Sequence, residues 1–130
     1  MTDPADYIAQ LKTALLISEA IADYAVLNAR VNTDDGYFRI RATLSNGDFF
    51  EAAEYFEVVD AQVITIDYRY QWMDGTQACL RRRWDNTPHH PELSQFPHHC
   101  HITREDNVVP SEPLSILDIL AVLEAELAAK

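Results

Sequence analysis

All five histidines of this 130-residue chain fall between positions 89 and 101, directly after a segment rich in arginine. The histidines are His89, His90, His98, His99 and His101, and the preceding segment contains Arg81, Arg83 and Asp85. Histidine takes up and releases protons near neutral pH. Arginine binds phosphate oxygens through paired hydrogen bonds. This combination is typical of acid–base chemistry on a phosphate ester.

The chemistry that this set would support is cleavage of RNA without a metal ion. One histidine would remove the proton of a 2′-hydroxyl group and another would protonate the leaving 5′-oxygen. Arg81 and Arg83 would bind the phosphate and stabilise the charge that develops on it. Asp85 would orient a histidine or pair with an arginine. All five histidines remain candidates for the acid and the base.

Two other interpretations of the histidines stay open. His98, His99, Cys100 and His101 are possible metal ligands, but their spacing matches no common zinc motif, so we expect no metal and no cofactor. The rings could also stack on Trp84, Phe96 or Trp72 and fix the segment without any chemistry.

Composition restricts the class of protein. With 130 residues, of which 48% are hydrophobic, the chain is long enough for one domain with a packed core. A formal net charge of −11 argues against indiscriminate binding to nucleic acid or anionic lipid. No apolar run is long enough to span a bilayer, the first residues do not resemble a secretory signal, and the only cysteines are Cys79 and Cys100. We therefore expect a cytoplasmic protein with no membrane association.

Helices are predicted at both ends of the chain. Asp3 followed by Pro4 indicates a helix start, and apolar residues recur at helical spacing over residues 4–17. Ser115 and Asp118 have the spacing of a capping box before a second apolar stripe, which predicts a helix over 115–129.

The middle of the chain, about residues 24–86, alternates between apolar and polar side chains. The alternation is clearest at 37–44 and 64–72, and Asn46-Gly47 indicates a type I′ hairpin turn. Short turns between such runs predict an antiparallel meander of about five strands. The fold class is therefore α+β, with both helices packed on one face. A first strand near 26–33 would lie at the edge and could support a homodimer.

Polar residues on the other face of this sheet include five arginines, which need partners or a ligand. The residues of this face are Arg39, Arg41, Asp67, Arg69, Arg81, Arg83 and Asp85. They could pair across strands with Glu51, Asp67 and Asp85, or they could form an anion site. Residues 87–113, which have no useful periodicity, are expected to be a long loop rich in histidine and proline.

Three motifs resemble the TumE family. They are Arg-Trp-Asp-Asn-x-Pro-His-His-Pro-Glu at 83–92, Phe-Pro-His-His-x-His at 96–101 and Val-Val-Pro-Ser-Glu-Pro at 108–113. The resemblance implies the toxin of a bacterial toxin–antitoxin module and a helix-turn-helix antitoxin as its partner. It supplies no reaction and no catalytic residues. Cys100 stands where we expect a basic residue in the family.

Two functions follow as hypotheses. The first is a toxin that cleaves RNA or a nucleotide with the loop histidines and the strand arginines. The second is a module without catalytic activity that binds the helix-turn-helix antitoxin or another protein through acidic residues at the termini and the exposed sheet face.

Overall fold

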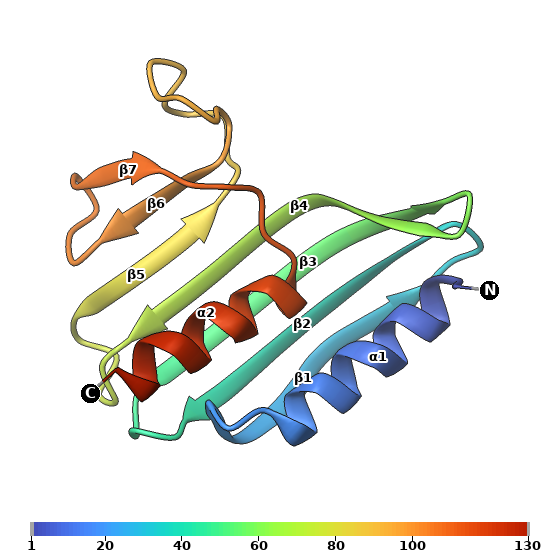
Figure 1. Ribbon diagram of the computed structural model, residues 1–130, viewed down its shortest axis with the longest axis horizontal. Helices are drawn as coiled ribbons and strands as arrows, with labels where there is room; N and C mark the ends of the chain where they lie inside the picture. The colour runs from blue at the N-terminus through green and yellow to red at the C-terminus, as the bar shows by residue number, and fades with distance from the viewer. Residues whose placement is uncertain (1, 130) are drawn as a thin grey trace.

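The computed structural model, which describes residues 2–129, contains one antiparallel sheet and two helices (Figure 1). The elements in chain order are α1 (Pro4–Ile17), β1 (Ile21–Val31), β2 (Asp35–Leu44), β3 (Phe49–Val59), β4 (Gln62–Met73), β5 (Leu80–Asp85), β6 (His99–Ile102), β7 (Val108–Pro110) and α2 (Ile116–Ala128). The strands lie side by side in that same order. This confirms the α+β class and the meander, with both helices on one face.

The predicted number of about five strands is wrong, because the described residues form seven. The two additional strands, β6 and β7, lie within the segment 87–113 that was expected to be a loop. β6 reads His-Cys-His-Ile, and this alternation of polar and apolar residues extends over only four positions, which is too short to stand out in the sequence. β7 has three residues and ends at a proline. The sheet therefore continues through the histidine segment.

Both helix starts agree with the sequence prediction. Asp3 accepts a hydrogen bond from the Asp6 amide at 2.8 Å, and the Asp6 carboxylate accepts one from the Asp3 amide at 3.2 Å. Ser115 and Asp118 form the same reciprocal pair at the start of α2. These contacts satisfy amides that lack a partner in the first helical turn. Neither helix is long and apolar enough to cross a membrane.

The turns differ from the prediction in detail. At Asn46-Gly47, where a type I′ turn was expected, only Gly47 has a positive φ (90°), and residues 45–48 together connect β2 to β3. A type I′ turn needs positive φ at both central residues. Asp60 and Ala61 meet that condition, with φ of 52° and 64°, in the two-residue connection between β3 and β4.

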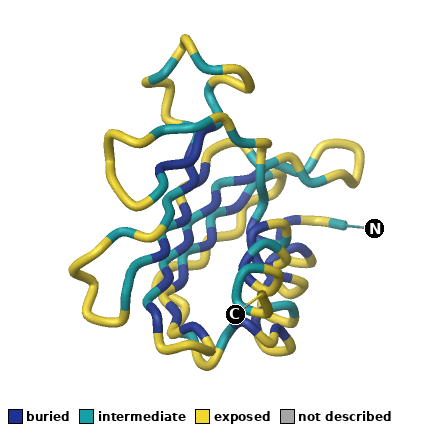
Figure 2. Tube along the Cα trace, turned by 60° about the vertical axis from the view of Figure 1, so that its left-hand side comes forward, coloured by how far each residue is buried: buried dark blue, intermediate teal, exposed yellow. Residues whose placement is uncertain are grey.

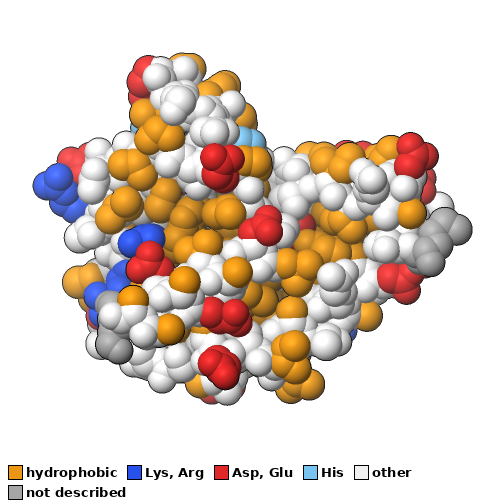
Figure 3. All heavy atoms as spheres, viewed as in Figure 1, with side chains coloured by type: hydrophobic (Ala, Val, Ile, Leu, Met, Phe, Trp, Pro, Cys, Tyr) orange, Lys and Arg blue, Asp and Glu red, His pale blue; other side chains and the backbone are white. Residues whose placement is uncertain are grey.

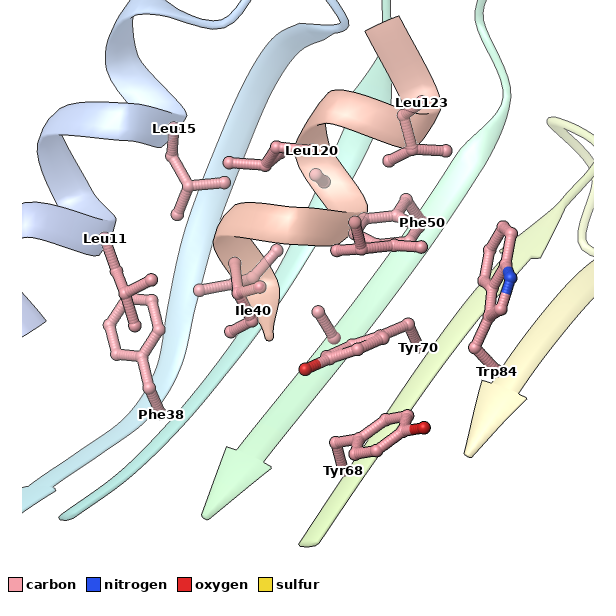
Figure 4. Close-up of a cluster of buried hydrophobic side chains, with 14 of the residues drawn as sticks. Leu11, Leu15, Phe38, Ile40, Phe50, Tyr68, Tyr70, Trp84, Leu120 and Leu123 are labelled. Atoms are coloured by element: carbon pink, nitrogen blue, oxygen red, sulfur yellow. The ribbon is translucent and has the colours of Figure 1, made fainter. Parts of the chain in front are cut away.

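The hydrophobic core lies between the helices and one face of the sheet. Leu11 and Leu15 of α1 and Leu120 and Leu123 of α2 point toward large side chains of the central strands (Figure 4). Phe38, Ile40, Phe50 and Tyr70 are among the strand residues in this cluster, and all four are fully buried. The alternation of each strand sends its other side chains to the opposite face.

That opposite face, here called the open face, is covered by neither helix (Figures 1 and 2). Viewed from the helix side, acidic side chains are scattered over the helices, while lysine and arginine gather at the left margin (Figure 3). Hardly any histidine is visible from this side. The residues that could carry chemistry must be sought on the open face.

Candidate active site

Two adjacent rows of cross-strand partners extend over five strands of the open face. The first row is Arg39–Ala53–Arg69–Asp85–His99, and the second is Arg41–Glu51–Gln71–Arg83–His101. Directly opposed residues of antiparallel strands share a face and are close neighbours. The unpredicted strand β6 is therefore what brings His99 beside Asp85 and His101 beside Arg83.

His99 is held between two acceptors. Its Nδ1 donates to the Pro97 carbonyl oxygen at 2.9 Å, and its Nε2 lies 2.9 Å from Oδ1 of Asp85. His99 and Asp85 are 2% and 4% exposed, respectively. Both ring nitrogens of His99 therefore have a partner, and the Pro97 carbonyl and the Asp85 carboxylate fix the orientation of the ring.

His101 has a different hydrogen-bond pattern. Its Nδ1 donates to the backbone carbonyl of Glu105 at 2.8 Å, and its Nε2 is 3.9 Å from Oδ2 of Asp85. Burial and the positive charge of Arg83 lower the pKa of His101. At neutral pH this ring is therefore uncharged, with its proton on Nδ1 and the lone pair of Nε2 directed toward the cluster.

Arg83 links two carboxylates at the edge of this cluster. Its Nε donates to Asp85 at 3.2 Å, and its Nη1 and Nη2 both bind the carboxylate of Glu105. The hydrogen bond from Arg83 lowers the pKa of Glu105. The Arg83 side chain is only 13% exposed. Arg83 is therefore a fixed positive charge that holds Asp85 and the segment carrying Glu105 in place.

His90 completes the cluster from the segment before β6. Its ring centroid lies 5.1 Å from that of His99 and 6.1 Å from that of His101, in edge-on orientation. Glu92 lies 3.5 Å from His90 Nδ1, so a protonated His90 has a counter-ion. His90 therefore lies next to both histidines of β6.

The three histidines could also hold a metal ion by their spacing alone. His90, His99 and His101 each offer one nitrogen, and these atoms all lie within 4.8 Å of one another. His99 and His101 also donate their other N–H to backbone carbonyls, as metal-bound histidines commonly do. However, His99 Nε2 already contacts Asp85, and the guanidinium of Arg83 lies next to that carboxylate.

A cavity of about 430 Å³ opens beside the cluster. Its lining consists of Arg69, Arg83, Asp85, Thr87, His89, His99, His101 and Glu105. Among residues 2–129, Arg69 has no carboxylate within ion-pair distance, and its guanidinium donates one hydrogen bond, to the Gln71 side-chain oxygen at 3.0 Å. The other open-face arginines of the two rows, Arg39, Arg41 and Arg83, are all paired with carboxylates. Arg69 is therefore the arginine that is available to an anion.

Two of the predicted site residues lie apart from this cluster. Arg81 stands at the other end of β5, where its Nε donates to Asp48 at 2.7 Å. His98 stacks on Tyr68, and its Nδ1 is 2.9 Å from the Tyr68 hydroxyl. Burial lowers the pKa of His98. The structure thus brings together Asp85, Arg83, His90, His99 and His101, with His89 on the cavity wall, and leaves Arg81 and His98 outside.

Sequence reasoning assigned no role in the site to Thr87 or Glu105, and it named Arg69 only as one of five arginines of a possible anion site. The alternation in 64–72 placed Arg69 on the correct face, and its lack of a carboxylate partner became visible only from the strand register. Nothing in the sequence pattern indicated Glu105, which reaches the site through the turn between β6 and β7.

Cys100 does not face the histidine cluster. It lies between His99 and His101 on β6, pairs in register with Trp84, and is 5% exposed on the helix side of the sheet. Burial raises the pKa of its thiol to about 11. A basic residue at this position would not point toward the cavity.

Comparison with known proteins gives one family. A family model described as toxin TumE matches residues 9–129, which includes every residue of the cluster and cavity. Searches of curated proteins and of solved structures gave no match.

Proposed function

Because the chain belongs to the TumE toxin family, we propose that it is the toxin of a toxin–antitoxin pair and acts by cleaving RNA without a metal ion. The observation that supports this best is the pairing of two unlike histidines, His101 on the wall of the cavity and His90 next to it. His101 presents an uncharged Nε2, and His90, whose protonated form has Glu92 as a counter-ion, lies beside it. A base and an acid in such contrasting environments are what phosphodiester cleavage requires.

In this proposal His101 is the general base. Its Nε2 takes the proton of a ribose 2′-hydroxyl, and the resulting oxygen attacks the neighbouring phosphorus. His90 gives a proton to the 5′-oxygen as the P–O bond breaks. The products are a 2′,3′-cyclic phosphate and a free 5′-hydroxyl, and proton exchange with water restores both rings. No oxidant or further reactant is needed.

The phosphate would be bound by Arg69 and His89 rather than by Arg81. Arg69 lines the cavity without a carboxylate partner, whereas Arg81 is engaged with Asp48. Arg83 contributes its positive charge to the cavity wall and fixes Asp85, which in turn positions His99. A preorganised charge of this kind stabilises the negative charge that develops on the phosphate oxygens.

The same geometry argues against a resident metal ion. A cation bound to the three histidines would have to displace His99 from Asp85 and would lie close to the guanidinium of Arg83. Both effects oppose binding, because like charges repel strongly where water is excluded. This favours proton transfer by the histidines themselves.

Membership of the toxin family also supports an antitoxin partner, and we propose a helix-turn-helix protein in this role. The acidic net charge of −11 suits a basic protein surface. If the histidines are not catalytic, binding to such a partner remains as the function of the chain, and the experiment below separates the two.

The experiment measures cleavage of a fluorescent single-stranded RNA by the purified protein and by two histidine variants. His101→Ala should slow cleavage by about 10²-fold or more. The matched control is His98→Ala, which removes a ring from the same segment outside the cavity and should change the rate by less than about threefold. With the wild-type protein, the rate should fall on the acid side below about pH 6.5, because the pKa of His101 is lowered by burial.

Equal rates for the two variants would contradict the proposal. The same variants should be expressed in growing cells with and without the neighbouring gene. If both variants fold and remain fully toxic, toxicity depends on binding and not on catalysis.

A further inference from the structure

A second hollow lies on the open face, next to the histidine cavity. It has a volume of about 420 Å³, within the range of small-molecule sites, and it shares Arg69 and Thr87 with the cavity. Its lining includes Tyr37, Arg39, Ala53 and Tyr55. We call this hollow the Ala53 groove.

The groove exists because Ala53 is small. Ala53 occupies the position between Arg39 and Arg69 in the first cross-strand row, where both neighbours have long side chains. It is half-buried on the open face, while the helix side of β3 is occupied by its sequence neighbours Ala52 and Glu54, which are fully buried. A larger residue at 53 would therefore fill the groove without entering the core.

Two tyrosines provide aromatic surface at this groove. Tyr37 and Tyr55 are cross-strand partners, and both line the groove. The Tyr55 hydroxyl donates to Asp35 at 2.6 Å, and the guanidinium of Arg30 lies over the Tyr37 ring at 5.1 Å. Both rings are thus held in place before any ligand binds. Aromatic side chains on an exposed sheet are the usual platform on which single-stranded bases stack.

The charges along the groove suit different parts of one nucleotide. Asp67, the cross-strand partner of Tyr55, is exposed and has no hydrogen bond or ion pair from its side chain to any of residues 2–129. Its carboxylate repels phosphate but accepts hydrogen bonds from N–H groups of a base. Arg69, at the boundary with the histidine cavity, suits phosphate. The groove therefore matches a base at Asp67 and Tyr55 followed by a phosphate at Arg69.

We propose that the Ala53 groove binds one nucleoside unit of single-stranded RNA, with its attached phosphate directed toward His90 and His101. The inference rests on the proposed ribonuclease function, because the phosphate that leaves the groove is the one that would be cleaved. A duplex does not fit, since a base must be unstacked and unpaired to lie on the tyrosines. The substrate class is thereby narrowed to single-stranded RNA.

The test uses an RNA tetranucleotide with 2′-O-methyl riboses, which binds but cannot be cleaved by a 2′-hydroxyl mechanism. Its affinity is measured by fluorescence anisotropy for the wild-type protein, Ala53→Tyr and Ala25→Tyr. Ala25 is exposed on β1, opposite Arg41, and does not line the groove. Ala25→Tyr therefore adds the same side chain to the same face of the sheet, but outside the groove. Ala53→Tyr should weaken binding by about tenfold or more, and Ala25→Tyr by less than about twofold.

The possible results distinguish the proposed binding in the Ala53 groove from the proposed ribonuclease activity. Equal binding by Ala53→Tyr and the wild type overturns the groove, and it leaves the ribonuclease proposal intact if His101→Ala still abolishes cleavage. Selective loss of binding in Ala53→Tyr supports the groove even if no RNA is cleaved, in which case the ribonuclease proposal fails alone. Absence of binding by the wild type overturns the groove. Thermal unfolding of both variants within a few degrees of the wild type shows that the fold is unchanged.

Discussion

Glu54 and Asp85 are both buried carboxylates, but they lie on opposite faces of the sheet and have different neighbours. Glu54, which is fully buried on the helix side, accepts hydrogen bonds from the Tyr7 hydroxyl, the Thr65 hydroxyl and the Ile116 amide, each at 2.9 Å. Asp85 contacts a guanidinium and an imidazole on the open face. The donors around Glu54 are hydroxyls and an amide, whereas the partners of Asp85 are a guanidinium and an imidazole, the side-chain groups that commonly serve phosphate binding and proton transfer.

This difference separates a structural carboxyl group from one suited to chemistry. Glu54 joins α1, β3, β4 and the start of α2, and burial raises its pKa. Neither of the two cavities described above is lined by Glu54. Asp85 lines a cavity, and its hydrogen-bond partner Arg83 lines the same cavity. Burial alone therefore does not identify an active-site carboxylate, and the kind of partner is the better criterion.

The largest expected effect comes from neutralising each carboxyl group in turn. Asp85→Asn should reduce the rate of RNA cleavage by about 10²-fold or more, because His99 and Arg83 lose the charge that positions them. Glu54→Gln should change the rate by less than about threefold. Cleavage assays at several pH values measure both, and the pH profile of Asp85→Asn should also shift. Similar rates for the two variants would remove the distinction between the carboxyl groups.

Glu54 should affect the stability of the fold rather than the rate of cleavage. A carboxyl group whose pKa is raised by folding favours the folded state most at pH values below its ordinary value of 4.5. That contribution is lost as the pH rises through the folded-state pKa. The wild-type protein should therefore lose stability relative to Glu54→Gln as the pH rises above about 4.5. Urea unfolding of both proteins at several pH values measures the difference.

A substitution at Tyr7 tests the stabilisation of Glu54 from the side of the hydrogen-bond donor. Tyr7→Phe removes the hydroxyl that donates to both oxygens of Glu54, at 2.9 and 3.1 Å, and should cost about 1–3 kcal/mol. A pH-independent difference between the wild type and Glu54→Gln, together with no effect of Tyr7→Phe, would show that Glu54 is not stabilised as described.

A smaller effect on cleavage is expected from zinc, which should act at the histidine cluster of the open face. EDTA should leave cleavage unchanged, because the proposed chemistry needs no metal. Zn²⁺ added in large excess should inhibit cleavage by about tenfold, because the excess can overcome the opposing effects of Asp85 and Arg83 and place the ion on the nitrogens of the histidine cluster, which blocks the base. Inhibition should weaken in His90→Ala and stay unchanged in His98→Ala. Loss of activity on treatment with EDTA, restored by zinc, would instead make the metal part of the mechanism.

The sequence predicted the helices and the long strands well because these segments have strong local signals. The capping residues fixed the starts of α1 and α2, and clean alternation identified β2 and β4. β6 was missed because its alternation covers only four residues, and the burial of His99 and His101 depends on Asp85 and backbone carbonyls that are distant in the sequence pattern. A pattern of hydrophobicity cannot record such partners.

The candidate site could be predicted only as a list of residue types. The sequence indicated histidine, arginine and Asp85, but it could not say that Arg81 pairs with Asp48 or that Arg69 has no carboxylate partner. Those facts depend on strand register, because shifting a strand by one residue sends its side chains to the other face. The choice of Arg69 over Arg81 therefore required the structure.

The smallest effect is expected at Cys100, which lies on the same side of the sheet as Glu54 although its neighbours in the chain are His99 and His101. Because burial raises the pKa of its thiol to about 11, iodoacetamide at neutral pH should modify the exposed Cys79 and leave Cys100 unmodified until the protein unfolds. Cys100→Ala should change the cleavage rate by less than about twofold, since the thiol does not face the cavity. Mass spectrometry of the labelled native protein and a cleavage assay measure the two effects. Labelling of Cys100 in the native state, or a large loss of activity in Cys100→Ala, would mean that β6 presents Cys100 to the same face as the histidines, and the assignment of the two faces would then be wrong.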